Sequence, residues 1–132
     1  MTSEEFPPRV LIVMPDQWRR ALLRAALREV GYDAVGTRGV SAGMRIPAKD
    51  PERGDVKLII IDQDALDGND APVQALIDTY RAPSILIARA TIEPPRGPWQ
   101  RTLTRPLAID DIVATVQSLV PLSAAGRRPL DE

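Results

Sequence analysis

The sequence contains neither cysteine nor histidine among its 132 residues. The lack of cysteine excludes disulfides, thiolate metal sites and a cysteine nucleophile. The lack of histidine removes the commonest general base and the commonest zinc ligand. Any acid–base chemistry would therefore fall to carboxylates, lysine or tyrosine.

The chain also lacks excess charge of either sign and long apolar runs. A net charge of -1 gives no general attraction to nucleic acid or to an anionic membrane. The longest apolar runs, of four to five residues, are too short to span a bilayer, and residues 1–5 lack the basic start of a signal peptide. We expect a cytoplasmic protein with no direct contact to nucleic acid or membrane.

The most informative stretch is the apolar run from Leu58 to Ile61. Its four consecutive bulky residues, three of them β-branched, are typical of a strand buried on both faces of a parallel sheet. The run stops at Asp62. Because open α/β sheets bind ligands just past the carboxyl ends of their strands, Asp62 is predicted to lie at a functional site.

Strand-like and helix-like segments alternate along the chain. This alternation predicts one parallel sheet with right-handed connections and helices on both faces. The further predicted strands are Val10–Met14, Tyr32–Thr37, Ser84–Ala88 and Arg101–Thr104. The predicted helices cover 17–30, 70–80 and 109–120, with a short irregular one at 41–46 that Ser41 could cap.

The length fits one domain with a single core. Residues 1–8 are polar and end in two prolines, which predicts an N-terminal lead-in. We place the domain at residues 9–121. Residues 122–132 are predicted to form a flexible tail or the stump of a linker.

Several of these segments occur in the same order in a known family. Over roughly residues 9 to 120 the chain resembles the CheY-like receiver domain of bacterial two-component response regulators. The resemblance rests on Val10–Val13, the helix closing on Gly31-Tyr32, Ile59–Asp62, Pro83–Ile87 and Arg105–Leu107. It implies a flavodoxin-like α/β fold whose five-stranded parallel sheet has the order 2-1-3-4-5. The family's fourth helix matches the stretch Pro94–Pro98, so we expect it to be shortened or replaced by a proline-rich loop.

The resemblance implies that Asp62 occupies the phosphoacceptor position. The family's acidic pair, which holds magnesium, matches Met14 and Pro15, and neither side chain can bind a hard cation. The family's threonine or serine matches Ala88, which has no hydroxyl. The family's lysine matches Arg105, which keeps the charge but carries it on a planar fork.

Two further acids lie near these positions in the sequence, Asp16 and Asp64. Together with Asp62 they could form an acidic cluster that holds a cation weakly. Alternatively, Asp16 caps its helix and Asp64 is a solvated loop acid. Without a cation, Arg105 would favour an Asp62 that stays ionised and salt-bridged. We expect no resident cofactor and no metal, and Mg²⁺ only if the acidic cluster forms.

The favoured hypothesis is a degenerate receiver, or pseudo-receiver, that acts without phosphorylation as a protein-interaction module and not as an enzyme. The switch aromatic of the family matches Thr102, which agrees with this hypothesis. Its partner would be a sensor kinase, an output domain, another regulator or a second copy of the chain. One alternative is a phosphorylatable receiver with a rearranged acidic site at Asp16, Asp62 and Asp64. Another is a flavodoxin-like binder of a flavin or nucleotide, which the lack of a phosphate-binding loop after the first strand disfavours.

The two tryptophans are candidates for a binding surface. For Trp18 we predict ordinary packing, because it falls at helical spacing with the apolar residues of segment 17–30. For Trp99, which lies among prolines, packing and binding both stay open.

Overall fold

A computed structural model describes residues 6–66, 70–90 and 97–122. Its centre is a five-stranded parallel sheet in the order β2-β1-β3-β4-β5, which confirms the predicted fold class. The strands are β1 (Arg9–Val13), β2 (Asp33–Thr37), β3 (Val56–Asp62), β4 (Ser84–Ala88) and β5 (Arg101–Thr104). Strand β3 lies in the middle of the sheet, as its apolar run predicts.

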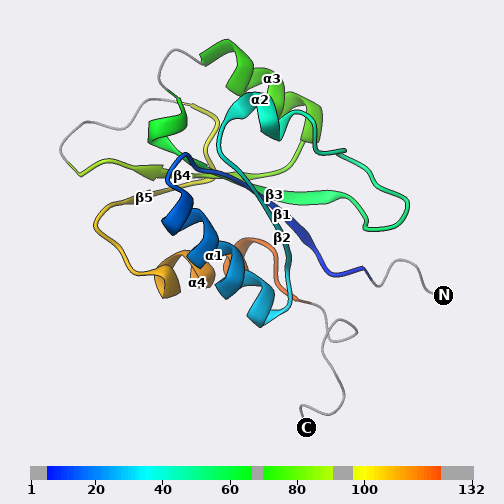
Figure 1. The fold of residues 1–132 in the computed structure, drawn as a ribbon, viewed down its shortest axis with the longest axis horizontal. Coiled ribbons are helices and arrows are strands. Elements are labelled where there is room, and N and C mark those ends of the chain that lie inside the picture. Colours follow the sequence, from blue (N-terminus) through cyan, green and yellow to red (C-terminus); the bar gives the residue numbers. More distant parts are fainter. Residues whose placement is uncertain (1–5, 67–69, 91–96, 123–132) are drawn as a thin grey trace, which may run out of the picture.

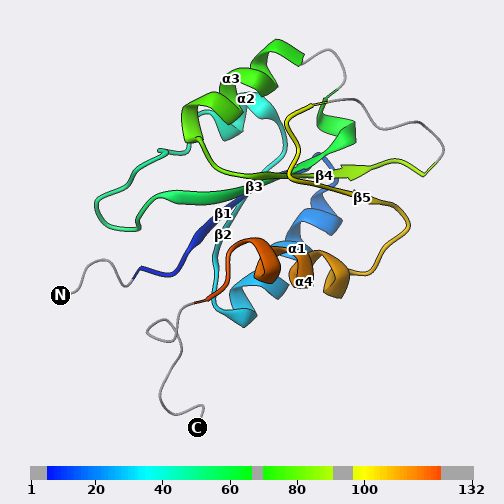
Figure 2. The ribbon, with the colours of Figure 1, turned by 180° about the vertical axis from the view of Figure 1, so that it is seen from behind.

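Helices cover both faces of this sheet (Figures 1 and 2). Helices α1 (Gln17–Val30) and α4 (Ile109–Leu119) lie on one face, and α2 (Val40–Gly43) and α3 (Asp70–Tyr80) lie on the other. Successive residues of β3 alternate between two cores: Ile60 packs on the α1/α4 side, and Ile59 and Ile61 pack on the α2/α3 side. A short 3₁₀ helix, η2 (Gln63–Ala65), follows β3.

Helix α1 has the bounds that the sequence predicts. The Asp16 carboxylate accepts a hydrogen bond from the Arg19 N–H at 3.0 Å, which caps the first turn. Gly31 ends the helix with a positive φ of 126°, a conformation that favours glycine.

The prediction for segment 41–46 is wrong at both ends. Helix α2 spans only Val40–Gly43, and Ser41 lies inside it and not at its N-cap, which is Gly39. The chain after α2 is held by Tyr80, whose hydroxyl donates to the carbonyls of Gly43, at 2.7 Å, and of Ile46. The backbone continues past Gly43 as turns, in which the Arg45 N–H donates to the carbonyl of Ala42 and the Ile46 N–H to that of Gly43, and the Tyr80 hydroxyl adds to these bonds.

Some sequence predictions fall outside the described residues. Pro94, Pro95 and the rest of 91–96 lie there, so the proline-rich replacement for a helix stays a prediction; the described residues between β4 and β5 are not helical. Only residues 6–8 of the lead-in and Leu122 of the tail are described, so both boundaries also stay predictions. None of the helices in the described ranges combines the length and the apolar character that a bilayer span requires.

The prediction for Trp18 is wrong, because its side chain is 73% exposed. The buried residues of α1 are Leu23 and Leu27. Trp18 precedes Leu27 by nine residues, which is about two and a half helical turns and places it on the opposite side of the helix. Trp99, by contrast, is half-buried against the core on the α2/α3 side.

Because Trp18 is exposed, Trp18→Ala should change the free energy of unfolding by less than about 0.5 kcal/mol. The control Leu27→Ala, at a fully buried position of the same helix, should cost about 3 kcal/mol. Urea unfolding measures both values. A cost for Trp18→Ala close to that of Leu27→Ala would contradict this placement of α1.

Candidate functional site

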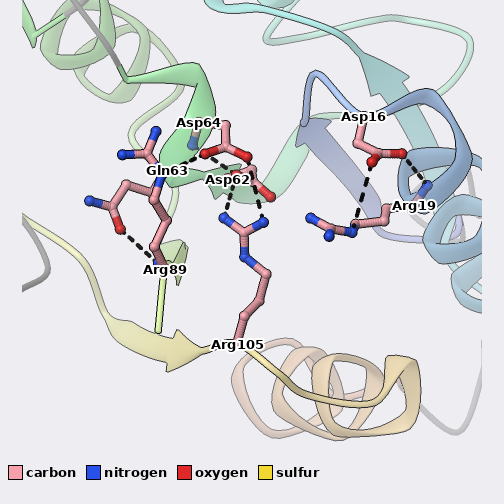
Figure 3. A network of polar contacts seen from close by, with 7 residues as sticks. All are labelled: Asp16, Arg19, Asp62, Gln63, Asp64, Arg89 and Arg105. Carbon is pink, nitrogen blue, oxygen red and sulfur yellow. Dashed lines mark hydrogen bonds and ion pairs between the residues drawn. The ribbon is translucent and has the colours of Figure 1, made fainter. Parts of the chain in front are cut away.

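The last residue of β3, Asp62, carries the most buried carboxylate of the site. The three residues before it are fully buried, and the residue itself is only 1% exposed. Its Oδ1 accepts hydrogen bonds from the Asp64 N–H at 2.8 Å and from Arg105 Nη2 at 3.2 Å (Figure 3). Its Oδ2 is also buried and has no hydrogen-bond partner among the described residues. The carboxylate is therefore half satisfied.

Arg105 bridges two carboxylates at this edge of the sheet. It follows β5 directly, and its backbone N–H donates to the carbonyl of Ala88, the last residue of β4, at 2.9 Å. Its guanidinium reaches Asp62 through Nη2 and Asp64 Oδ2 through Nη1, the latter at 3.5 Å. The side chain is 18% exposed, and its Nε is buried without a hydrogen-bond partner in the described ranges. The position that matches the family's lysine thus contacts the position that matches the phosphoacceptor.

Asp64 is exposed, as the solvated alternative of the sequence analysis expects, but it lies in η2 and is ion-paired. Its Oδ1 accepts a hydrogen bond from Arg89 Nε at 2.6 Å. This bond is the main reason that the pKa of Asp64 lies below its ordinary value, and the charge of Arg105 lowers it further. Asp64 therefore stays ionised at neutral pH.

Asp16 has the structural role of a helix cap. Besides capping α1, its carboxylate lies 3.9 Å from Arg19 Nε, and Figure 3 shows the Arg19 side chain between Asp16 and Asp62. In the part of the chain that the structure describes, no three acidic side chains are grouped so that they could hold a metal ion. The acidic cluster of Asp16, Asp62 and Asp64 is therefore not assembled there.

The positions that match the family's metal and hydroxyl residues are apolar. Met14 is 3% exposed and packs in the core on the α1/α4 side. Pro15 is exposed, and Ala88 is fully buried in the other core. None of these three side chains offers an oxygen to a cation or a phosphoryl group.

Burial dominates the ionisation of Asp62. It raises the pKa of this carboxyl above the ordinary value of 3.8, because the charged form loses its hydration. The Asp64 N–H and the Arg105 charge oppose the shift without cancelling it. Arg105 is therefore the counter-charge that makes an ionised Asp62 tolerable at this depth.

Sequence reasoning missed two residues that complete the site, Gln63 and Arg89. The Gln63 side chain is buried, and its Oε1 accepts a hydrogen bond from the Arg89 N–H at 2.8 Å. Arg89 then pairs with Asp64. Both residues directly follow the carboxyl ends of strands, β3 and β4, which is the signal that could have identified them.

Comparison with known proteins finds similarity at the level of the fold. No protein-family model matches the sequence, and neither does any curated protein. Solved structures do match. A response regulator receiver protein from Burkholderia phymatum is 20% identical with a TM-score of 0.69, over 89% of this chain and 98% of that one. The non-phosphorylated HemR receiver domain from Leptospira biflexa is 17% identical with a TM-score of 0.70, over 92% and 98% of the two chains.

A third match is the signal receiver domain of an HD domain-containing protein from Pseudomonas fluorescens Pf-5. It is 16% identical with a TM-score of 0.70, over 86% of this chain and 94% of that one. All three similarities extend over almost the whole neighbouring domain, and the sheet order found here is the flavodoxin-like order 2-1-3-4-5. The chain therefore has the fold of response regulator receiver domains.

Proposed function

We propose that this chain is a receiver-like module of two-component signal transduction that works through protein contacts and without phosphorylation of Asp62. The observation that carries the proposal is the Arg105–Asp62 ion pair. Of the two oxygens that could attack a phosphoryl group, Oδ1 already accepts two hydrogen bonds, one of them from a guanidinium. Attack through Oδ1 would have to break this pair, and attack through the buried Oδ2 would lack a metal site among the described residues.

The surroundings of Asp62 support the same proposal. Phosphoryl transfer depends on positive charge that neutralises the phosphoryl oxygens, and magnesium usually supplies it through one or two carboxylates. Here Met14 and Pro15 follow β1 at that point, and Asp16 is engaged at the N-terminus of α1. The cation would therefore meet few oxygen ligands.

A module of this kind would act by binding another protein. Among the solved structures of similar fold, one is described as a receiver-modulated diguanylate cyclase from Pelobacter carbinolicus, 15% identical with a TM-score of 0.59 over 86% of this chain and 92% of that one. Another is the receiver domain of an HD domain-containing protein. By analogy, we propose that a sensor kinase, an output domain or another regulator binds this chain, with a second copy as a further candidate.

Incubation with acetyl phosphate and magnesium tests the proposal. We expect no stable gain of a phosphoryl group on the intact chain by mass spectrometry, at any time point, because the described residues form no metal site beside Asp62 and this carboxylate is paired with Arg105. Wild type and Asp62→Asn should give the same spectrum. Labelling of the wild type that disappears in Asp62→Asn would overturn the proposal in favour of a phosphorylatable receiver with a rearranged acidic site.

A further inference from the structure

A cleft beside Asp62 suits a small molecule. Helices α1 and α4, the end of β4 and the loop after β5 enclose it, and its volume is about 590 Å³. That volume lies within the range of small-molecule sites in proteins. Buried apolar side chains form its wall, among them Leu23, Ile87 and Ile112.

The polar end of the cleft carries buried groups without partners. Asp62 and Arg105 both line it. Asp62 Oδ2, an acceptor, and Arg105 Nε, a donor, are buried and make no hydrogen bond within the described residues. Unsatisfied buried polar groups cost free energy and favour any ligand that supplies the missing partner. In Figure 3 the Asp62 oxygen without a dashed line lies on the side toward Arg19.

Access to this oxygen requires a neighbouring side chain to move. Arg19 is suited to do so, because its side chain is 49% exposed and its only ion pair among the described residues is long, at 3.9 Å to Asp16. Arg19 also lines the cleft. Its displacement costs little, since exposed ion pairs contribute little to stability.

The charges around the polar end select a neutral head group. In the described part of the chain, three guanidiniums line the cleft, of Arg19, Arg89 and Arg105, and each contacts a carboxylate; of these acids Asp62 lines the cleft itself, and Asp16 and Asp64 lie outside its lining (Figure 3). An anionic head would meet the unpaired oxygen of Asp62, and a cationic head would meet the arginines. A neutral hydrogen-bond donor avoids both penalties.

From this juxtaposition we propose that the cleft binds a neutral, mostly apolar small molecule whose hydroxyl-type head group donates a hydrogen bond to Asp62 Oδ2. The apolar body lies along the wall of Leu23, Ile87 and Ile112. A phenolic hydroxyl fits the polar end, since it donates to the carboxylate and can accept from a guanidinium. The site goes beyond the proposed function, because it gives the module an input other than phosphate.

Titration of the whole chain with 4-butylphenol and its methyl ether, 4-butylanisole, tests the proposal by amide NMR. The two probes share an apolar body, but only the phenol has a donor. We expect saturable one-to-one binding of the phenol, with shifts centred on the cleft, and roughly tenfold weaker binding of the ether, which is the expected effect of one hydrogen bond to a charged acceptor. The charged probe 4-butylbenzoate should also bind more weakly than the phenol.

Asp62→Asn sharpens the test. Its amide oxygen should keep the two donors that now contact Oδ1, so its NH₂ group would replace the unpaired Oδ2 with a donor. The tenfold preference for the phenol over the ether should then disappear. Asp78→Asn, the same exchange at an exposed position on α3, should keep the preference. Leu22→Trp, which fills the cleft from its exposed rim, should lower the affinity for both probes at least tenfold.

Three results would overturn the proposal: no saturable binding of the phenol, equal affinity for phenol and ether in the wild type, or an unchanged preference in Asp62→Asn. If Asp62→Asn fails to fold, the ether comparison and Leu22→Trp still decide. The proposal on phosphorylation would survive each of these results, because phosphoryl labelling tests it separately.

Discussion

Replacing Arg105 with methionine is expected to lower the free energy of unfolding at pH 7 by about 3 kcal/mol, because it leaves the carboxylate of Asp62 buried without its counter-charge. Methionine keeps much of the apolar stem of arginine, so the lowered free energy of unfolding reflects the missing guanidinium and not a loss of packing. Urea unfolding at constant protein concentration measures the effect.

A double-mutant cycle assigns that loss to the pair. Asp62→Asn alone should change stability by less than about 1 kcal/mol, since it removes the charge that burial disfavours and keeps an acceptor for Arg105 and the Asp64 N–H. In the Asp62→Asn background, Arg105→Met should cost only about 1 kcal/mol. An equal cost of Arg105→Met in both backgrounds would show that the guanidinium does not stabilise this carboxylate.

The pH dependence of the same variant has a defined sign. Since the pKa of Asp62 is raised in the folded state, its contribution to stability is fully present below its ordinary value of 3.8 and is lost as the pH rises through the folded-state pKa. Arg105→Met removes a group that lowers this pKa, so the stability that is lost as the pH rises should be larger in this variant than in the wild type. The deficit of Arg105→Met against the wild type should therefore shrink on acidification. Asp64 behaves oppositely: its lowered pKa gives stability that is present above 3.8 and is lost as the pH falls.

Ile60→Ala is expected to cost about 4 kcal/mol. Ile60 is fully buried in the central strand, and its register partners Ile12 on β1 and Ile85 on β4 are fully buried too. Because hydrogen-bonded strands on both sides limit relaxation, the deleted atoms should leave a cavity as well as lost burial. The control Met44→Ala, at a 42% exposed side chain, should cost less than about 1 kcal/mol in the same urea titration. Similar costs for both would contradict the central place of β3.

The fold was predictable because its signals are local. Wholly apolar runs identify β1, β3 and β4, and the pair Asp16 and Gly31 sets both ends of α1. The failures come from tertiary contacts. Helix α2 begins one residue before Ser41 and continues past Gly43 only as turns, and nothing local shows that the hydroxyl of Tyr80, more than thirty residues later in the chain, binds the carbonyls of Gly43 and Ile46.

The position of the site was predictable, and the salt bridge of Asp62 was predictable only as one of two open alternatives. The end of an apolar strand marks Asp62, and the resemblance marks Arg105, but these residues are 43 positions apart and charge alone does not decide whether they pair. Arg89 was missed because the sequence around a single arginine after a strand does not identify its ion-pair partner, Asp64. Trp18 was misplaced because spacing alone does not say which side of a helix faces the sheet, and Leu23 and Leu27 decide it here.

The central claim is that Asp62 is paired with Arg105 and does not accept a phosphoryl group beside a bound cation. The most direct measurement is an amide NMR titration of the wild type with magnesium, followed by beryllofluoride, which mimics a phosphoryl group on a carboxylate. We predict no saturable shift at the backbone amides of Asp62, Asp64 and Arg105 at millimolar magnesium, and no further change with beryllofluoride. Saturable shifts at these three residues that need both magnesium and beryllofluoride would contradict the claim.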